Sequence, residues 1–416
     1  MTKVINTAAA LLAGTALALS ASAASAASMA KAGMDKRVAD LEREVTLLKN
    51  QMKSAMMAKA APDKNIVSGN SHVKVTIYGQ VNKAVRLSSS GGDTQFDVVD
   101  NDGSSSRIGI RAVGQIDKNI SIVGWHELEW QYNRRSHIDA ARGGARADGT
   151  SLRLRARHVD LSISHKGAGS VHIGQGSIAG DAADLISLGG VGHVFGTAGH
   201  AADGTTASRG DERGISRGWR TFKFFGAREN RIMYVTPSIM GASVRLSYSQ
   251  NDSFSAGLRY GGAPMGKALR VMFWAGYRQD PNDHVGGSGN TDTSWGLSAG
   301  VAHADSGLSV SGNYSAQQTK GSAARPTAWF AEIGWAGKLI AAGKTQLAVG
   351  YGKFNDDVHL DSQQIWGAVN QNVDAAAADV YAGLAMDSGD AANAAGDASE
   401  ERDDVYIFIA GARVKF

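Results

Sequence analysis

The last thirteen residues of the chain, 404–416, alternate strictly between two kinds of side chain. Neighbouring side chains of a β-strand point to opposite faces, so this alternation predicts one strand. Its second face begins apolar at Val405 and ends charged at Arg413 and Lys415. A strand that crosses a bilayer needs about 9–11 residues, with an apolar outer face and aromatic side chains at the interfaces. The first face meets that requirement with Tyr406, Phe408, Ala410, Ala412, Val414 and Phe416.

The same period of two returns along the chain from residue 73 onward. Glycine-rich or polar segments separate the alternating stretches, including a predicted loop at 88–104 and a long stretch at 177–218 without sustained alternation. Together with 404–416 the alternating stretches make sixteen predicted strands, an even number that places both ends of the wall on one side of the membrane. The other fifteen are 73–87, 105–116, 120–134, 152–164, 170–176, 229–236, 242–250, 254–261, 268–279, 293–304, 308–319, 327–336, 344–354, 362–373 and 379–387.

These strands predict an all-β fold, a 16-stranded antiparallel transmembrane β-barrel over residues 73–416. Two soluble alternatives, a β-sandwich and a β-solenoid, fit less well. A solenoid needs a fixed repeat, which the chain lacks, and a sandwich needs polar outer faces. The 52 glycines and 5 prolines in 416 residues suit many strands and turns. A mean hydropathy of −0.20 is compatible with a barrel, because only half of each strand faces lipid.

Residues 1–27 have the pattern of a cleaved signal peptide. Lys3 supplies the positive start, 7–19 is a short apolar run, and 21–23 and 24–26 are small-residue cleavage candidates. The apolar run is too short for a membrane-spanning helix. We therefore expect an exported protein.

A short helical segment is predicted between the signal peptide and the barrel, at residues 35–57. Its charges at flanking heptad positions would pair in a parallel coiled coil, Arg37 with Glu42 and Glu44 with Lys49, which requires an oligomer. The alternative is a single amphipathic helix that lies on the barrel or the membrane. Residues 58–71 form the linker. The predicted coiled-coil core comprises Val38, Leu41, Val45, Leu48 and Met52.

Several kinds of chemistry are disfavoured by composition and spacing. The chain has no cysteine, and its net charge of +4 is too small to indicate nucleic-acid binding. His158, His165 and His172 lack the short spacing of metal ligands. No nucleophile triad or paired-carboxylate pattern stands out. We expect no cofactor, no metal and no enzymatic activity.

Five short motifs resemble the Gram-negative trimeric outer-membrane porins, especially those of alphaproteobacterial type. They cover the opening strand, the first loop and second strand, the end of the fifth strand, the sixth strand with its turn, and the aromatic C-terminus. The helix before the barrel departs from the simplest members of that family. The matching segments are 75–85, 99–109, 174–177, 230–238 and 415–416.

The resemblance implies a homotrimer with a water-filled pore, narrowed by a third loop that folds inward. It implies passive diffusion of ions and small hydrophilic solutes across the outer membrane, in contact with its lipids and lipopolysaccharide. The irregular stretch at 177–218 lies where that loop is expected. The resemblance also implies that barrel-assembly machinery recognises the aromatic C-terminal strand through Phe416, Val414, Phe408 and Tyr406.

Charged side chains near the third loop are the candidates for pore selectivity, because ions close to low-dielectric walls feel local charges strongly. Asp181 and Asp184 are the acidic candidates on the loop. Some of the facing arginines would alternatively bind lipopolysaccharide phosphates high on the strands. The basic candidates of the pore wall are Arg86, Arg107, Arg111, Arg153, Arg155 and Arg157.

Two other functions remain open at this point. One is a substrate-selective channel of the same architecture, which tight and saturating block by one solute would distinguish. The other is a surface adhesin or structural barrel protein that uses residues 35–57 as a stalk. That protein would conduct no ions.

Overall fold

The computed structural model describes most of the barrel region, within one compact unit, Asn65–Phe416. The predicted signal peptide, the helix 35–57 and the linker up to residue 69 lie outside the described residues. Those described are 70–90, 93–132, 153–183, 185–196, 228–264, 266–280, 291–319, 325–355, 361–392 and 399–416.

The described chain is almost entirely β-strand, joined into one antiparallel sheet. Each predicted strand corresponds to a strand of the structure, with bounds that differ by a few residues. The strands are β1 (Val73–Ser90), β2 (Asp93–Asp100), β3 (Arg107–Gln115), β4 (Ile120–Gln131), β5 (Arg153–His165), β6 (Gly169–Ser177), β7 (Arg228–Val235), β8 (Ala242–Ser249), β9 (Phe254–Gly262), β10 (Leu269–Gln279), β11 (Thr291–His303), β12 (Leu308–Thr319), β13 (Thr327–Ile340), β14 (Gly343–Asn355), β15 (Asp361–Val373), β16 (Ala378–Ala392) and β17 (Ser399–Lys415).

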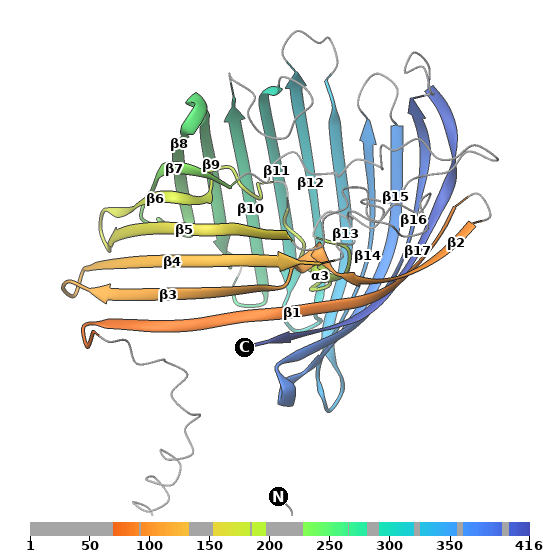
Figure 1. Cartoon of the computed structure of the whole chain (residues 1–416), viewed down its shortest axis with the longest axis horizontal. Coiled ribbons are helices and arrows are strands. Elements are labelled where there is room, and N and C mark those ends of the chain that lie inside the picture. Colours follow the sequence, from red (N-terminus) through yellow and green to blue (C-terminus); the bar gives the residue numbers. More distant parts are fainter. Residues whose placement is uncertain are drawn as a thin grey trace, which may run out of the picture. The chain divides into compact units, whose positions relative to one another are not determined.

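The sheet closes on itself into a barrel. β1 pairs with β17, from Gln80 opposite Lys415 to Ser89 opposite Tyr406, and Figure 1 shows these two strands side by side. β2 and β3 pair with successive halves of β1 and so occupy one position in the wall. The 17 strand segments of the described sheet therefore build 16 wall positions. The predicted 16-stranded antiparallel barrel is confirmed.

The predicted loop at 88–104 is wrong for most of its length. β1 continues to Ser90, and β2 covers eight of these residues. Phe96 and Val98 point outward, 62% and 58% exposed, whereas Asp97 and Val99 are buried on the inner face. Ladder pairing with β1 outweighs the low strand propensity of Gly, Ser and Asp. Between β2 and β3 the wall is interrupted by a short 3-10 helix, η1 (Asp102–Ser104).

The two faces of the wall differ as the alternation predicts. Ile108 and Ile110 of β3 are exposed on the outer face, and Glu127 and Glu129 of β4 are buried on the inner face. Outward rings pair across neighbouring strands, with Trp295 and Tyr314 at 5.3 Å between centroids. Such rings are typical of the interface girdles of outer-membrane barrels.

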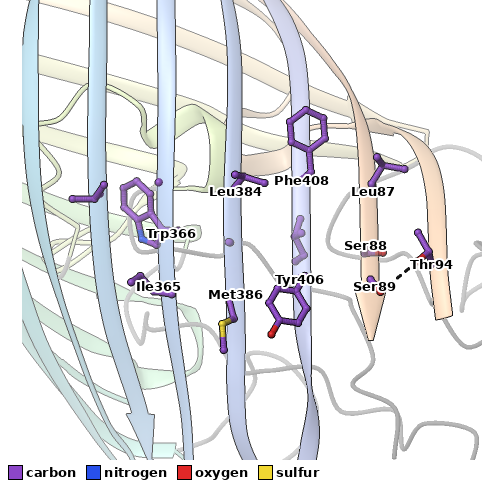
Figure 2. Close-up of a pocket in the computed structure, with 14 residues that line it drawn as sticks. Leu87, Ser88, Ser89, Thr94, Ile365, Trp366, Leu384, Met386, Tyr406 and Phe408 are labelled. Carbon is purple, nitrogen blue, oxygen red and sulfur yellow. Dashed lines mark hydrogen bonds between the residues drawn. The ribbon is translucent and has the colours of Figure 1, made fainter. Parts of the chain in front are cut away.

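Outward side chains of β15–β17 and β1 also border a shallow apolar groove on the outside of the barrel (Figure 2). Leu384, Tyr406 and Phe408 line it together with Leu87. Trp366 and Ile407, also part of this lining, are themselves buried and belong to the inner cluster described below. The outer surface around this groove is therefore mainly apolar.

Short turns such as 116–119 and 166–168 lie at the rim that also carries the start of β1 and the end of β17. In outer-membrane barrels the short turns face the periplasm. None of the helices within the described residues is long and apolar enough to cross a membrane.

Candidate functional site

The segment that follows β6 runs along the inner face of the barrel. Its described part, residues 178–183 and 185–196, is called the inner loop below. Serine side chains of the wall accept hydrogen bonds from its backbone, so its path is set by the main chain. The N–H groups of Ala179, Gly180 and Ile186 donate to Ser247 Oγ of β8 (2.9 Å), Ser255 Oγ of β9 (2.9 Å) and Ser298 Oγ of β11 (3.3 Å).

Glu332 of β13 anchors the middle of the inner loop. Its carboxylate accepts hydrogen bonds from the Gly189 N–H (2.7 Å) and from Ser187 Oγ (2.8 Å). Glu332 is only 2% exposed. Charge-assisted hydrogen bonds of this kind contribute about 1.5–3 kcal/mol each, and a buried carboxylate without them is strongly destabilising. Glu332 therefore binds the inner loop and has almost no contact with pore water.

The far end of the inner loop forms a short helix, α3 (Gly192–Phe195), packed against the inner face of β13–β17. Val194 and Phe195 are fully buried there among Trp366, Ile407 and Ile409. Burial of these side chains accounts for the apolar inner face of β17 near Ile407. A strand that faced only pore water would carry polar side chains at those positions.

Asn101, at the junction of β2 and η1, also holds α3 in place. Its side-chain amide donates to the carbonyl oxygens of His193 and Val194, both at 3.1 Å, and to the Tyr381 hydroxyl at 3.0 Å. The Asn101 side-chain oxygen accepts from the Gly103 N–H and caps η1. The break between β2 and β3 thus places a residue that fastens the inner loop.

Glycines on the inner face allow the loop to lie flat on the wall. A Cβ at Gly257 would lie 2.3 Å from the Ala179 carbonyl oxygen, and a Cβ at Gly334 would lie 2.4 Å from Gly189 Cα. Both distances are far below van der Waals contact. The same close approach occurs at three further glycines of the wall, Gly276, Gly300 and Gly383.

Three predicted arginines come together on the inner face of β3 and β5, and are called the arginine wall below: Arg107, Arg155 and Arg157. Arg157 donates to Glu127 and, at 2.8 Å, to Glu129. Arg107 lies 3.7 Å from Glu127, and Arg155 lies 3.9 Å from Glu129. Three positive charges face two negative charges, so this surface keeps a net positive charge.

The other predicted basic residues lie elsewhere. Arg86 points inward from β1 but is 0% exposed, so it does not contact pore water. Arg111 is exposed on β3, with its guanidinium 5.7 Å from the Trp125 ring centroid. Arg153 is the first residue of β5.

Asp181 is the described member of the predicted acidic pair, and Asp184 lies outside the described residues. Asp181 is 6% exposed. Its charge acts on three arginines that the sequence reasoning missed: Arg228, Arg245 and Arg259. Arg245 and Arg259 alternate with the outward Val244 and Leu258, and that alternation was the available signal. Asp181 therefore lies among a basic group on β7–β9.

The predicted assembly-signal side chains are exposed on the outer face of the C-terminal strand. Phe416 ends the chain beside β1, where its backbone N–H and carbonyl both bond to Gly79, at 3.1 and 2.8 Å. The exposed set is Tyr406, Phe408, Val414 and Phe416. No cluster of three or more His, Asp or Glu side chains suited to a metal occurs within the described ranges.

A comparison with protein families decides the identity of this barrel. Residues 10–401 match the model of the Gram-negative porin family. The chain is a Gram-negative porin. Its family and its barrel place this porin in the outer membrane, as a channel through which solutes diffuse passively. No curated protein matches it in sequence.

Solved structures share the fold of this porin at low sequence identity. OmpT of Vibrio cholerae in its trimer form has a TM-score of 0.54 at 16% identity, covering 83% of this chain and 99% of that chain. An anion-selective porin from Comamonas acidovorans has a TM-score of 0.53 at 16% identity, covering 83% and 100%. OmpF of Salmonella typhi in complex with daunomycin has 0.50 at 13% identity, covering 85% and 100%.

Proposed function

We propose that this porin conducts ions and small hydrophilic solutes through a constriction between the inner loop and the arginine wall, without a catalytic step. The observation that carries the proposal is the attachment of the inner loop across the inner face of the barrel, from Ser247 to Asn101. A loop bound along its length narrows the lumen and does not move aside. The remaining opening borders the arginine wall, where Arg155 has 42% of its side chain exposed.

The charges of the arginine wall support a polar constriction. Glu127 and Glu129 hold Arg157 in place through two hydrogen bonds, so the guanidinium has a fixed position. Fixed charges in a narrow lumen attract dipolar and charged solutes and disfavour apolar ones. The wall thus selects by polarity as well as by width.

Conductance of the purified protein in planar lipid bilayers tests this proposal. We expect discrete, stable steps of conductance. Glu332→Ala removes the central anchor and should raise the step size or the open-channel noise, while the exposed control Glu401→Ala should not. A protein that folds but conducts no ions would overturn the channel mechanism, and unchanged Glu332→Ala channels would overturn the role of the inner loop.

Assembly as a homotrimer is the oligomeric state that this proposal includes. Lys83 projects outward from β1 and forms an ion pair with Asp100 of β2, which is 2% exposed. A charged pair on the outer face is costly against lipid chains, and far less costly beneath another protein surface. The predicted coiled coil at 35–57 also requires partner copies.

The chain ends have proposed roles in export and assembly. Residues 1–27 act as a cleaved signal peptide, and 58–71 link the coiled coil to the barrel over 73–416. The exposed C-terminal strand with Phe416 is the signal for the barrel-assembly machinery. The apolar outer face contacts outer-membrane lipids and lipopolysaccharide.

A further inference from the structure

A second pair of inward arginines lies on the periplasmic side of the inner loop. Arg245 is near the start of β8, and Arg259 is near the end of β9. In the ladder Arg245 is opposite Gly257, and Arg259 is opposite Ser243, so the two arginines are diagonal neighbours on one face. Diagonal neighbours are about 7–8 Å apart, within reach of long side chains. The inner loop covers Gly257 at Ala179, which places both arginines between the loop and the turn rim.

The guanidinium of Arg259 is held in place by an aromatic ring and a backbone carbonyl, neither of which carries a negative charge. Its Cζ lies 4.5 Å from the Trp274 ring centroid, in a stacked cation–π position. One of its NH₂ groups donates to the Asp181 backbone carbonyl at 2.7 Å. The Trp274 ring and the Asp181 carbonyl thus orient the guanidinium of Arg259 without supplying a negative charge.

Arg245 has a guanidinium donor that is available to a ligand. Its Nε is buried and has no hydrogen-bond acceptor among the described residues. Ion pairs found within the described ranges include neither Arg245 nor Arg259. A buried donor without an acceptor is destabilising, unless a bound group supplies the acceptor.

Asp181 does not neutralise this pair alone. Its single negative charge faces the positive charges of Arg245, Arg259 and Arg228. Arg228 begins β7 opposite Ser177, at the point where the inner loop leaves β6. Its buried Nε also has no acceptor among the described residues.

We propose that Arg245 and Arg259 form a binding site for small oxyanions, carboxylate or phosphate, on the periplasmic side of the constriction. This proposal rests on the proposed channel function, and the site would make the channel selective for such anions. Guanidinium forks bind carboxylate and phosphate oxygens with paired, charge-assisted hydrogen bonds. An anion that passes the arginine wall meets Arg228 and then this pair, so its path remains positive on both sides of the inner loop.

Planar bilayers containing the full-length protein provide the test. Reversal potentials are measured in a KCl gradient, and the chloride current is then titrated with succinate or inorganic phosphate. The variant is R245Q/R259Q. The matched control K118Q/K166Q also removes two positive charges, but from exposed periplasmic turns.

We expect anion preference in the natural protein and saturating block by succinate, phosphate or both. Block by one alone identifies the oxyanion that the site accepts. R245Q/R259Q should weaken block at least about tenfold and move the reversal potential toward zero, because the variant loses two positive charges and their charge-assisted hydrogen bonds to the anion. K118Q/K166Q should resemble the natural protein.

Conducting channels that neither oxyanion blocks would overturn the site while leaving the channel function intact. Equal weakening by both double variants would also overturn it, because a general loss of charge would then explain the block. Absence of any conductance would instead contradict the proposed channel itself.

Discussion

At the scale of single residues, His193 shows how the inner loop depends on burial. Its imidazole lies within α3, with Nε2 3.2 Å from Asn370 Oδ1 and its ring edge-on to Tyr381 at 5.1 Å. Burial, assisted by the nearby charge of Arg413, lowers the pKa of His193 to about 4. The imidazole is therefore neutral in the folded loop at neutral pH.

Acid should loosen the loop through this residue. The unfolded chain binds a proton near the ordinary histidine pKa of about 6.5, whereas the folded chain binds it near 4. The contribution of neutral His193 to the free energy of unfolding is thus fully present above about pH 6.5. It is lost as the pH drops toward 4, by about 3 kcal/mol at most. His193→Gln keeps a polar group and removes the titration. Thermal unfolding at pH 7 and 4.5 should show a smaller acid effect in the variant, and equal effects would assign the loss to other groups.

Individual pore residues were harder to predict than faces. Alternation puts Arg107 and Arg155 on the polar face of their strands, and a β-bulge at Arg157 brings its side chain to Glu127 and Glu129 as well. It could not reveal that Arg86 on the same face is buried, because burial there depends on contacts between segments distant in sequence. Arg245 and Arg259 show the same alternation but were not among the predicted pore residues, because nothing in their own strands indicates that the inner loop passes over β8 and β9.

At the scale of secondary-structure elements, strand positions followed from the period of two, and the main error was β2. The segment 88–104 is rich in Gly, Ser and Asp, a composition typical of loops, yet Phe96 and Val98 of β2 keep the outward pattern. The inner loop had no periodic signal. The wall nevertheless carries a signal of the loop's position, because apolar residues such as Ile407 and Ile409 lie on the inner face, where pore water would favour polar residues.

The flat contact between loop and wall can be tested with two glycines of β9. Gly257→Ala places a methyl group against the Ala179 carbonyl, whereas a Cβ at Gly261 on the same face meets nothing within 4 Å. Overpacking of this kind costs about 1–3 kcal/mol. Gly257→Ala should therefore lower the thermal midpoint and change the conductance, with Gly261→Ala unchanged by either measurement. Indistinguishable variants would show that the loop yields easily.

At the scale of the whole molecule, the 16-position closed sheet was predictable because lipid outside and water inside impose one pattern on every strand. The break between β2 and β3 could not be predicted from the sequence, since it depends on the hydrogen bonds of Asn101 to α3 and Tyr381. Assembly beyond one barrel is predicted by residues 35–57, which lie outside the described part of the chain.

A matched pair of substitutions tests the predicted coiled coil. Leu48→Lys puts a charge at a core position of the heptad, while Asn50→Lys adds the same charge at an outward position. We expect Leu48→Lys to lower the heat resistance of trimers on gels, and Asn50→Lys to leave it intact. Equal trimer stability in both would favour a helix that lies on the membrane or the barrel.

The serine and glutamate anchors hold the inner loop by its backbone N–H groups, at Ala179, Gly180, Ile186 and Gly189. Every amino acid except proline carries that group. Side chains of the loop that point away from the wall are consequently free to vary during evolution while the loop keeps its course. A lineage can retune which solutes enter by substitutions in the loop alone, and the wall that holds it need not change.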